Sequence, residues 1–391
     1  MEPLKPSRSS HSLAATTSHQ SGSPRSLLIR KPQLSSISSL CATPFRFPSN
    51  FSIESHTIRI FSMSYKLAHT IKQENNASIF AIRYSPDNEC ILLGCSDGHL
   101  RVYDAHDGRH MYTWNTSGKK QIKLPVTSLR FRPFTQTRKN IVLVAGSGGI
   151  VQHWHITSGR CLHTITEPNN QVYAVDYRDD GKFFATAGKD AAVRVYDEAT
   201  KSLVVTMKGG SGNSAGHANR VFTLKFAKND PNILLSGGWD NTVQIWDKRK
   251  DTAVRRIFGP HICGDALDLD SNNTILTGSW RTDRQIQLWD FSTGKLMEEI
   301  KLPEDPNTKQ RCSIYTACFN GDSDLIACGG SGSNEARVIN RSNGKFVGEL
   351  TGLDKAVYSA TFSPDNAFLA VGGGDGNVYL MKRTGILSHE R

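Results

Sequence analysis

The chain has 391 residues and a formal net charge of +11 at pH 7, and its composition excludes several classes of protein. No apolar run approaches the roughly 18 residues that a membrane-spanning helix needs, so no membrane span is expected. The eight cysteines include no Cys-x-x-Cys pair and follow no repeating spacing. This pattern indicates thiols in a reducing compartment, the cytoplasm or the nucleus, rather than a disulfide framework.

The positive charge is spread thinly where the chain is expected to fold. Residues 1–62 hold seven Lys or Arg and two Glu, which leaves 40 basic and 34 acidic residues, a net charge of +6, for the remainder. Because a phosphate-binding surface usually concentrates Lys and Arg more densely, nucleic-acid binding is the alternative hypothesis and not the leading one.

Residues 1–62 have the composition of a segment without a packed core. They contain 16 serines and six prolines and show no apolar periodicity. Such a segment cannot bury enough surface to offset the entropy lost on ordering, so we expect a disordered tail. Its Ser- and Arg-rich, acid-poor character also fits an organelle transit peptide. Met63, just before the first strand, leaves open an upstream extension of the reading frame.

Residues 65–71 alternate apolar and polar side chains, as expected of a half-buried strand. After them, one cassette recurs seven times up to residue 382. Each repeat has an inner strand such as 172–177, a tight turn, a second strand, a Gly-rich corner and a third strand that ends at a marker pair. The markers are Tyr103-Asp104, Trp154-His155, Tyr196-Asp197, Trp246-Asp247, Trp289-Asp290, Ile339-Asn340 and Met381-Lys382. They lie 51, 42, 50, 43, 50 and 42 residues apart, a period that predicts β-propeller blades.

These cassettes resemble the repeats of the WD-repeat family over about residues 64–382. The resemblance implies an all-β fold, a seven-bladed β-propeller of four-stranded antiparallel blades, occupying residues 63–391. Only nine residues follow the third strand of the last repeat, too few for a confident fourth strand. We therefore expect the N-terminal strand to supply that strand and to close the ring, which removes two exposed edges.

An aspartate six residues before the marker recurs at the corner of five repeats. These residues are Asp97, Asp190, Asp240, Asp283 and Asp375, of which Asp283 follows a corner lengthened by two residues. A carboxylate there can accept backbone N–H bonds and fix the turn. In the fourth repeat the resemblance implies that His217 contacts both Asp240 and Ser236. Ser236 would in turn reach the indole of Trp246. We interpret this set as a buried structural network and not as a hydrolase triad.

The other repeats depart from this pattern to different degrees. The third has Thr186 and the fifth Thr277 at the serine position, whereas repeats two and six lack the corner aspartate. In repeat five, Gly264 stands at the first apolar position of the inner strand. Departures from local consistency often mark function, so we expect repeats four and five to carry specificity.

The resemblance also implies a partner-binding face at the ends of the inner strands around the central channel. One inner-strand residue of each repeat is expected to be exposed on this face. From the first repeat to the seventh, these residues are Phe80, Thr127, Tyr173, Phe222, Asp265, Tyr315 and Tyr358. Lys189, Arg220, Trp239 and Trp280 are neighbours of these positions. Apart from Thr127, these residues form the predicted partner-binding set, because aromatic residues and Arg dominate interaction hot spots. Packing around the channel mouth is the alternative, but the two corner tryptophans have little core to fill.

No pattern for a cofactor or metal is found. His153 and His155 share a strand face, but no third ligand has a suitable spacing. The leading hypothesis is a non-catalytic scaffold that binds a peptide or protein surface. The alternative is a nucleic-acid or ribonucleoprotein subunit in which Arg220, Lys189 and Arg281 contact phosphate and the aromatic residues stack on bases.

Overall fold

The computed structural model describes residues 63–73, 75–117, 123–134, 140–209, 215–306 and 309–385. The regular elements of these residues are 28 strands. None of the described residues forms a helix that is long and apolar enough to cross a membrane. The predicted tail, residues 1–62, lies outside the described residues.

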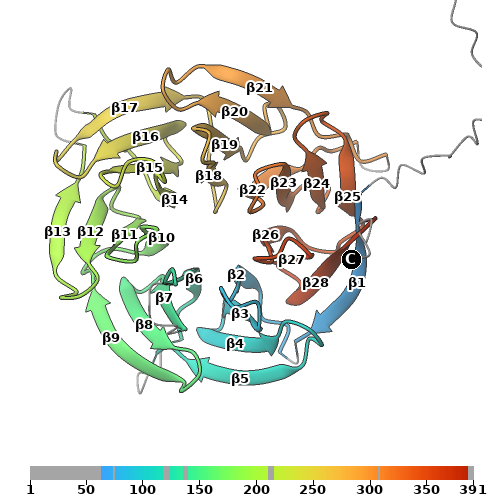
Figure 1. Cartoon of the computed structure of the whole chain (residues 1–391), viewed down its shortest axis with the longest axis horizontal. Coiled ribbons are helices and arrows are strands. Elements are labelled where there is room, and N and C mark those ends of the chain that lie inside the picture. Colours follow the sequence, from blue (N-terminus) through green and yellow to red (C-terminus); the bar gives the residue numbers. More distant parts are fainter. Residues whose placement is uncertain are drawn as a thin grey trace, which may run out of the picture. The chain divides into compact units, whose positions relative to one another are not determined.

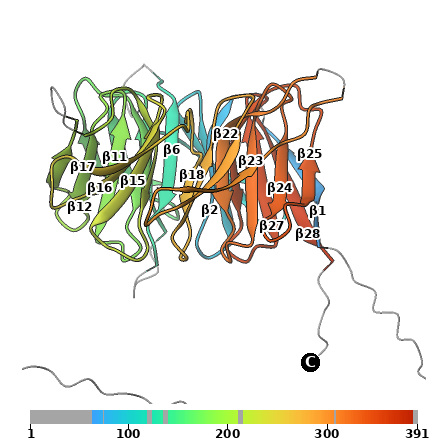
Figure 2. The same cartoon turned by 90° about the horizontal axis from the view of Figure 1, so that it is seen from above.

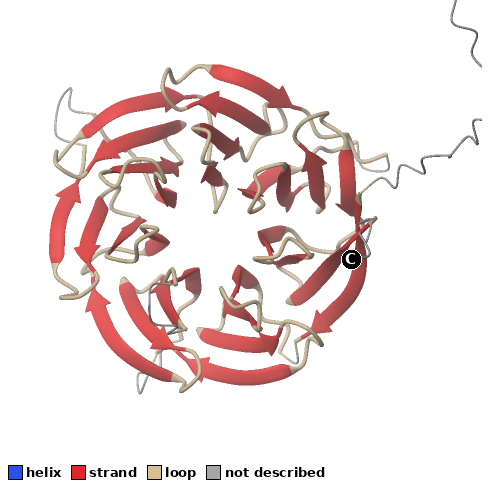
Figure 3. Cartoon of the chain, in the orientation of Figure 1, coloured by secondary structure: helices blue, strands red, loops and turns tan. Residues whose placement is uncertain are grey.

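The strands form seven blades around a central channel, as the sequence predicted (Figures 1 and 3). Blade one comprises β2 (Ile79–Tyr84), β3 (Cys90–Cys95), β4 (His99–Asp104) and β5 (His110–Asn115). Blade two comprises β6 (Val126–Phe131), β7 (Ile141–Gly146), β8 (Ile150–His155) and β9 (Arg160–Thr166). Blade three comprises β10 (Val172–Tyr177), β11 (Phe183–Gly188), β12 (Val193–Asp197) and β13 (Leu203–Met207). Blade four comprises β14 (Val221–Phe226), β15 (Ile233–Gly238), β16 (Thr242–Asp247) and β17 (Ala253–Phe258).

The remaining blades complete the ring. Blade five comprises β18 (Leu267–Leu269), β19 (Thr274–Gly278), β20 (Ile286–Asp290) and β21 (Leu296–Ile300). Blade six comprises β22 (Ser313–Phe319), β23 (Leu325–Ser331), β24 (Ala336–Asn340) and β25 (Phe346–Leu350). Blade seven comprises β26 (Val357–Phe362), β27 (Phe368–Gly373), β28 (Asn377–Thr384) and, from the N-terminal end, β1 (Ser64–Lys72).

The ring is closed by β1, which confirms the predicted role of the N-terminal strand. β1 pairs antiparallel with β28 from Ser64↔Thr384 to Lys72↔Asn377, and the two strands lie side by side in Figure 1. A single parallel pairing, Tyr65↔Gly348, also joins β1 to β25 of blade six. A Cβ at residue 348 would lie 2.7 Å from the Cβ of Tyr65, so this approach requires glycine. Blades six and seven thus form one eight-stranded sheet.

Burial falls from the inside of each blade to the outside. The six residues of β3 are all buried, whereas the outermost strand of the same blade, β5, has no buried residue. Strands that carry apolar side chains on both faces pack against the neighbouring blades on either side. In the view of Figure 2 the strands run between two faces of the ring, so the loops at each strand end gather on one face or the other.

A β-bulge at the start of the inner strand recurs in six blades. The register shifts between Ile79 and Ala81 in blade one and at the matching residues of blades two, three, four, six and seven. A bulge sets two residues against one and turns a side chain out of the regular alternation. Residues three apart, such as Phe80 and Arg83, therefore both line the channel, although strict alternation would place them on opposite faces.

Blade five differs, because its inner strand is only three residues long. The segment before β18 departs from the strand path: the Ala266 N–H bonds to the Gly264 carbonyl, and the Ala317 N–H of blade six bonds to the Asp265 carbonyl. A Cβ at residue 264 would lie 2.3 Å from the Tyr315 carbonyl oxygen. Glycine at the first apolar position is thus required by this close approach.

Candidate functional site

The polar network of blade four has the hydrogen bonds that the resemblance implies. His217 Nδ1 lies 2.8 Å from an Asp240 oxygen, and His217 Nε2 lies 2.7 Å from Ser236 Oγ. The Trp246 indole N–H donates to the same Oγ at 2.7 Å. Ser236 has no exposed surface. A substrate therefore has no access to this hydroxyl, and the set is built to hold strands together and not to attack a carbonyl.

Blade three has an equivalent network that was missed in the sequence. Glu167 stands 23 residues before Asp190, the same spacing that separates His217 from Asp240. Its carboxylate accepts hydrogen bonds from the hydroxyls of Thr186 and Tyr196. In blade five the Trp289 indole N–H donates to Thr277 Oγ1 at 3.0 Å. The network thus persists with other residue types, and the fixed spacing was the signal for it.

Four of the five corner aspartates act as expected. Asp97, Asp190, Asp240 and Asp375 each accept a hydrogen bond from the backbone N–H two residues later. The prediction for Asp283 is wrong. Its side chain is exposed, and within the described part of the chain it makes no hydrogen bond. The two-residue insertion lets this corner follow another path, so counting back from the marker no longer locates the turn-fixing residue.

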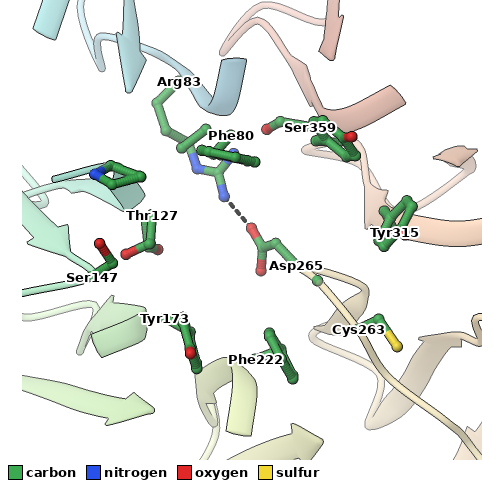
Figure 4. Close-up of a pocket in the computed structure, with 15 residues that line it drawn as sticks. Phe80, Arg83, Thr127, Ser147, Tyr173, Phe222, Cys263, Asp265, Tyr315 and Ser359 are labelled. Atoms are coloured by element: carbon green, nitrogen blue, oxygen red, sulfur yellow. Dashed lines mark hydrogen bonds and ion pairs between the residues drawn. The ribbon is translucent and has the colours of Figure 1, made fainter. Parts of the chain in front are cut away.

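The seven predicted inner-strand residues come together around one cavity of about 420 Å³ at one end of the channel (Figure 4). We call them the mouth ring: Phe80, Thr127, Tyr173, Phe222, Asp265, Tyr315 and Tyr358. In six blades the member is the bulge residue itself, which explains why each side chain leaves the sheet and faces the channel. Sequence reasoning missed Ser147 and Cys263, which also line this cavity.

The aromatic members of the mouth ring form two arcs. In the first, the Tyr173 and Phe222 rings stack at a centroid distance of 4.9 Å, and Phe222 contacts Trp239 at 5.2 Å. Thr127 interrupts the ring at blade two, where its hydroxyl bonds to backbone carbonyls. Asp265 interrupts it at blade five.

In the second arc, Trp280 contacts Tyr315 at 6.2 Å, Tyr315 contacts Tyr358 at 5.4 Å, and Tyr358 contacts Phe80 at 5.5 Å. Each arc thus runs from a corner tryptophan into the cavity wall. The two predicted tryptophans and five predicted aromatic wall residues therefore form continuous surfaces.

The corner tryptophans are the exposed ends of these arcs. Trp239 is 37% exposed and Trp280 is 43% exposed. Their indole N–H groups donate within the chain, to Cys263 Sγ at 2.9 Å and to Ser331 Oγ at 3.2 Å. The rings therefore present mainly apolar surface. Burial raises the pKa of Cys263 to about 11, so this thiol stays protonated at neutral pH.

Of the two predicted cations, only one belongs to this surface. The Arg220 guanidinium lies over the Trp239 ring at 4.9 Å. Lys189 is exposed at the corner of blade three, and its side chain does not line the cavity. Neither residue forms an ion pair among the described residues. Arg220 is thus a cation beside an aromatic arc, with no ion-pair partner in the described part of the chain.

Asp265 occupies a different position from its neighbours in the mouth ring. Its side chain is 27% exposed and forms an ion pair with Arg83 at the base of the cavity (Figure 4) and a second ion pair with Arg130. Thr223 donates a further hydrogen bond to it at 3.0 Å. We expected Asp265 on the exposed rim, but the structure places it in the channel, because the irregular segment before β18 carries it inward. Its accessibility to a partner is thus lower than predicted.

A second ring of side chains lies three residues further along the inner strands. This charged ring consists of Arg83, Arg130, Asp176, Lys225, Asp268, Cys318 and Thr361, which line a cavity of about 360 Å³. Arg130 Nε lies 3.2 Å from Asp176, and Lys225 Nζ lies 3.2 Å from Asp268. With Asp265, three cations face three carboxylates, so the charges that line this part of the channel are balanced. The constant offset of three residues from the mouth ring was a sequence signal for it.

The two histidines considered for metal binding have separate environments. His153 is buried against Glu198, with 3.1 Å between Nε2 and a carboxylate oxygen, whereas His155 contacts Ser158. Burial lowers the pKa of His153 although Glu198 opposes that shift. Across the described ranges, no group of three or more His, Cys, Asp or Glu is arranged to hold a metal ion.

Comparisons with known proteins agree with this architecture. The model described as "WD domain, G-beta repeat" matches residues 159–197, 211–247 and 344–380. The model of the anaphase-promoting complex subunit 4 WD40 domain matches residues 50–133. Each of the three repeat matches ends within the third strand of a blade or at its marker pair. A matched repeat therefore does not include the outermost strand of the blade in which it ends.

The curated relatives share about a quarter of their aligned residues with this chain. The chain is 25% identical to pre-mRNA-processing factor 19 of Oryza sativa subsp. japonica over 325 residues, which cover 81% of this chain and 57% of that protein. It is 24% identical to the APC/C activator protein CDC20 of Saccharomyces cerevisiae, over 63% of this chain and 47% of that protein. It is 25% identical to the target of rapamycin complex subunit wat1 of Schizosaccharomyces pombe, over 61% of this chain and 73% of that protein.

The chain thus spans about half the length of the first two of these relatives. In this chain the repeat recurs at a period of 42 to 51 residues and builds seven four-stranded blades. With these repeats, this ring and these family matches, the chain belongs to the WD-repeat β-propeller family.

Proposed function

We propose that this protein is a non-catalytic scaffold that binds a peptide or a protein surface at the mouth ring. The observation that carries the proposal is the pair of aromatic arcs, which run without a break from the exposed tryptophans into the cavity. Large, rigid aromatic side chains lose little conformational entropy on binding and dominate interaction hot spots. Arg220, stacked on Trp239, adds a hot-spot residue type to the same surface.

The chemistry of the described groups supports a binding role over a catalytic one. The Asp240, His217 and Ser236 set is buried and bonded to Trp246. The thiol nearest the cavity, Cys263, has a raised pKa. A catalytic site needs a nucleophile, a base and room for a substrate at one place. The carboxylate that lines this cavity, Asp265, is already paired with Arg83 and Arg130 and is not a free base.

Relatives provide weaker support of the same kind. Two of them are named as an activator of APC/C and as a subunit of the target of rapamycin complex. The seven cysteines in the described ranges are free thiols. This supports, as a proposal, a reducing compartment such as the cytoplasm or the nucleus.

Affinity purification from a native lysate tests the proposal. The bait is the full chain, and the comparison is a variant with Tyr173→Ala, Arg220→Ala and Trp239→Ala. A matched control, Arg109→Glu, changes a residue whose side chain is 72% exposed in the β4–β5 turn, at the opposite strand ends from the mouth ring. Circular dichroism checks that all three proteins are folded.

We expect a set of proteins retained by the wild type and by Arg109→Glu but reduced at least tenfold on the triple variant. Equal retention by all three proteins would refute binding at this face. The alternative, a nucleic-acid partner, is separated by salt: binding that falls by about 10³-fold or more between roughly 50 and 200 mM salt would favour phosphate contacts.

A further inference from the structure

The cavity inside the mouth ring has a wall and a base of different chemistry. Its wall is formed by the rings of Phe80, Tyr173, Phe222, Tyr315 and Tyr358. A volume of about 420 Å³ falls in the range of pockets that enclose a small ligand. The wall therefore favours a bulky group with apolar or aromatic surface.

The base carries charge that is already compensated. Asp265 Oδ1 accepts hydrogen bonds from Arg130 and Thr223, each at 3.0 Å, and Oδ2 accepts from Arg130 at 2.8 Å and from Arg83. Two guanidinium groups thus share one carboxylate, and the acceptor sites of this carboxylate are filled. Asp265 is also the one carboxylate among the residues that line this cavity.

This saturation decides which side chain can enter. A Lys or Arg side chain would lose its hydration and would meet two guanidinium groups with no free carboxylate to compensate it. An inserted carboxylate would have to compete with Asp265 for Arg83 and Arg130. A bulky uncharged side chain meets neither obstacle, because it needs only contact with the aromatic wall.

The rim beside the first arc has the opposite property, since its charge is not compensated. Arg220 is held against Trp239 and near the Tyr173 hydroxyl, where it acts to lower the pKa of Tyr173, although burial raises that pKa overall. No carboxylate among the described residues forms an ion pair with it. By contrast, the corner carboxylates Asp190 and Asp240 are bonded to Arg194 and His217. The uncompensated charge at this rim is therefore positive.

We propose that the cavity takes one bulky, uncharged side chain, aromatic or aliphatic, from an extended segment of the partner, and that an acidic residue next to it contacts Arg220. The proposal rests on the function proposed above and adds the chemistry of the bound segment. It excludes a Lys or Arg side chain as the group inserted in the cavity.

Selection from a displayed library of random nine-residue peptides tests the proposal on the full chain. Peptides are selected on the wild type and counted as face binders if Phe222→Ala, which removes part of the cavity wall, lowers their affinity at least tenfold while Arg109→Glu does not. We expect the face binders to share one aromatic or aliphatic position flanked by Asp or Glu. Replacing that position with Arg in the resynthesised peptide should weaken binding at least tenfold.

A charge-reversal variant provides the second measurement and does not depend on a change in the cavity wall. Selection on Arg220→Glu should move the flanking preference from acidic to basic residues and keep the aromatic or aliphatic position. Circular dichroism spectra of all variants should match that of the wild type.

The outcomes separate this inference from the function on which it rests. Face binders that share a Lys or Arg position would overturn the inference and leave the scaffold function standing. Selection that yields no face binders would count against both. If short single-stranded oligonucleotides bind the same face and show the steep salt dependence described above, a nucleic acid would replace the peptide as the occupant.

Discussion

Replacing Asp265, the charged member of the mouth ring, with Asn should destabilise the propeller. The substitution preserves shape but removes the charge that Arg83 and Arg130 share. Arg130 keeps Asp176, whereas no other carboxylate forms an ion pair with Arg83 in the described residues. In the variant the two guanidinium groups would stay close together, but only Arg130 would still have a carboxylate partner among the described residues, Asp176.

The expected loss of stability can be worked out from the Coulomb energy of one ion pair and from the cost of removing one partner of a buried pair. A charge pair about 4 Å apart in a medium of effective dielectric constant near 20 interacts by about 4 kcal/mol. Removing one partner of a buried pair costs about 3–5 kcal/mol, because the remaining charge is uncompensated. Since the Asp265 side chain is 27% exposed, water reduces this cost. We expect a loss of about 2–4 kcal/mol in the free energy of unfolding.

Urea denaturation followed by tryptophan fluorescence measures this loss, and calorimetry checks whether unfolding is two-state. Asp283→Asn is the matched control, since Asp283 is exposed and makes no hydrogen bond with the described residues; it should change stability by less than about 0.5 kcal/mol. A further variant, Arg83→Met with Asp265→Leu, removes both charges and should recover part of the stability. If Asp265→Asn were as stable as the control, the ion pairs of Asp265 with Arg83 and Arg130 would not contribute to holding the blades.

Three other predictions concern the blade network, the closing strand and pH. His217→Ala should lower the free energy of unfolding by about 1–3 kcal/mol, because Asp240 and Ser236 lose a buried partner; an unchanged urea midpoint would contradict this. Deleting residues 64–72 should lower the melting temperature by more than about 10 °C or prevent folding, whereas deleting residues 1–60 should leave it unchanged in calorimetry. Burial opposes ionisation of Asp265, but Arg130 and Lys225 outweigh it and hold its pKa below the ordinary value. A carboxyl group with a lowered pKa stabilises the fold above about pH 4 and loses this contribution as the pH falls through its folded-state pKa, so the wild type should lose more stability than Asp265→Asn on acidification from pH 5 to pH 3.

The architecture could be predicted because each blade repeats the same local rules. The markers, the corner aspartates and the shortage of residues after β28 together indicated seven blades and a closing strand. The mouth ring could also be located, since the family resemblance indicated which inner-strand residue of each repeat is exposed. The β-bulge that turns these side chains toward the channel is not visible in the sequence.

What could not be predicted depends on contacts between blades. The ion pairs of Asp265 join the segment before β18 to Arg130 and Arg83, which lie 135 and 182 residues away along the chain on two other inner strands. No local pattern indicates such pairing. The prediction for Asp283 was wrong for a local reason. A two-residue insertion changes the path of the corner, so the position six residues before the marker no longer holds the turn-fixing aspartate. Glu167 was missed for a third reason. It has the 23-residue spacing to the corner aspartate that His217 has in blade four, but it is a glutamate where a histidine was sought.

The pairing of β1 with β28 also constrains the order of events during synthesis. Ser64 bonds to Thr384, 320 residues later, so β1 leaves the ribosome long before its partner exists. Until then its edge is unpaired, and the exposed Lys66 and His69 on that strand make it a poor template for other chains. Blades one to five can form their sheets as they emerge, whereas the eight-stranded sheet cannot be completed until translation has nearly finished. A ribosome stalled before residue 377 would therefore carry an open, incomplete ring.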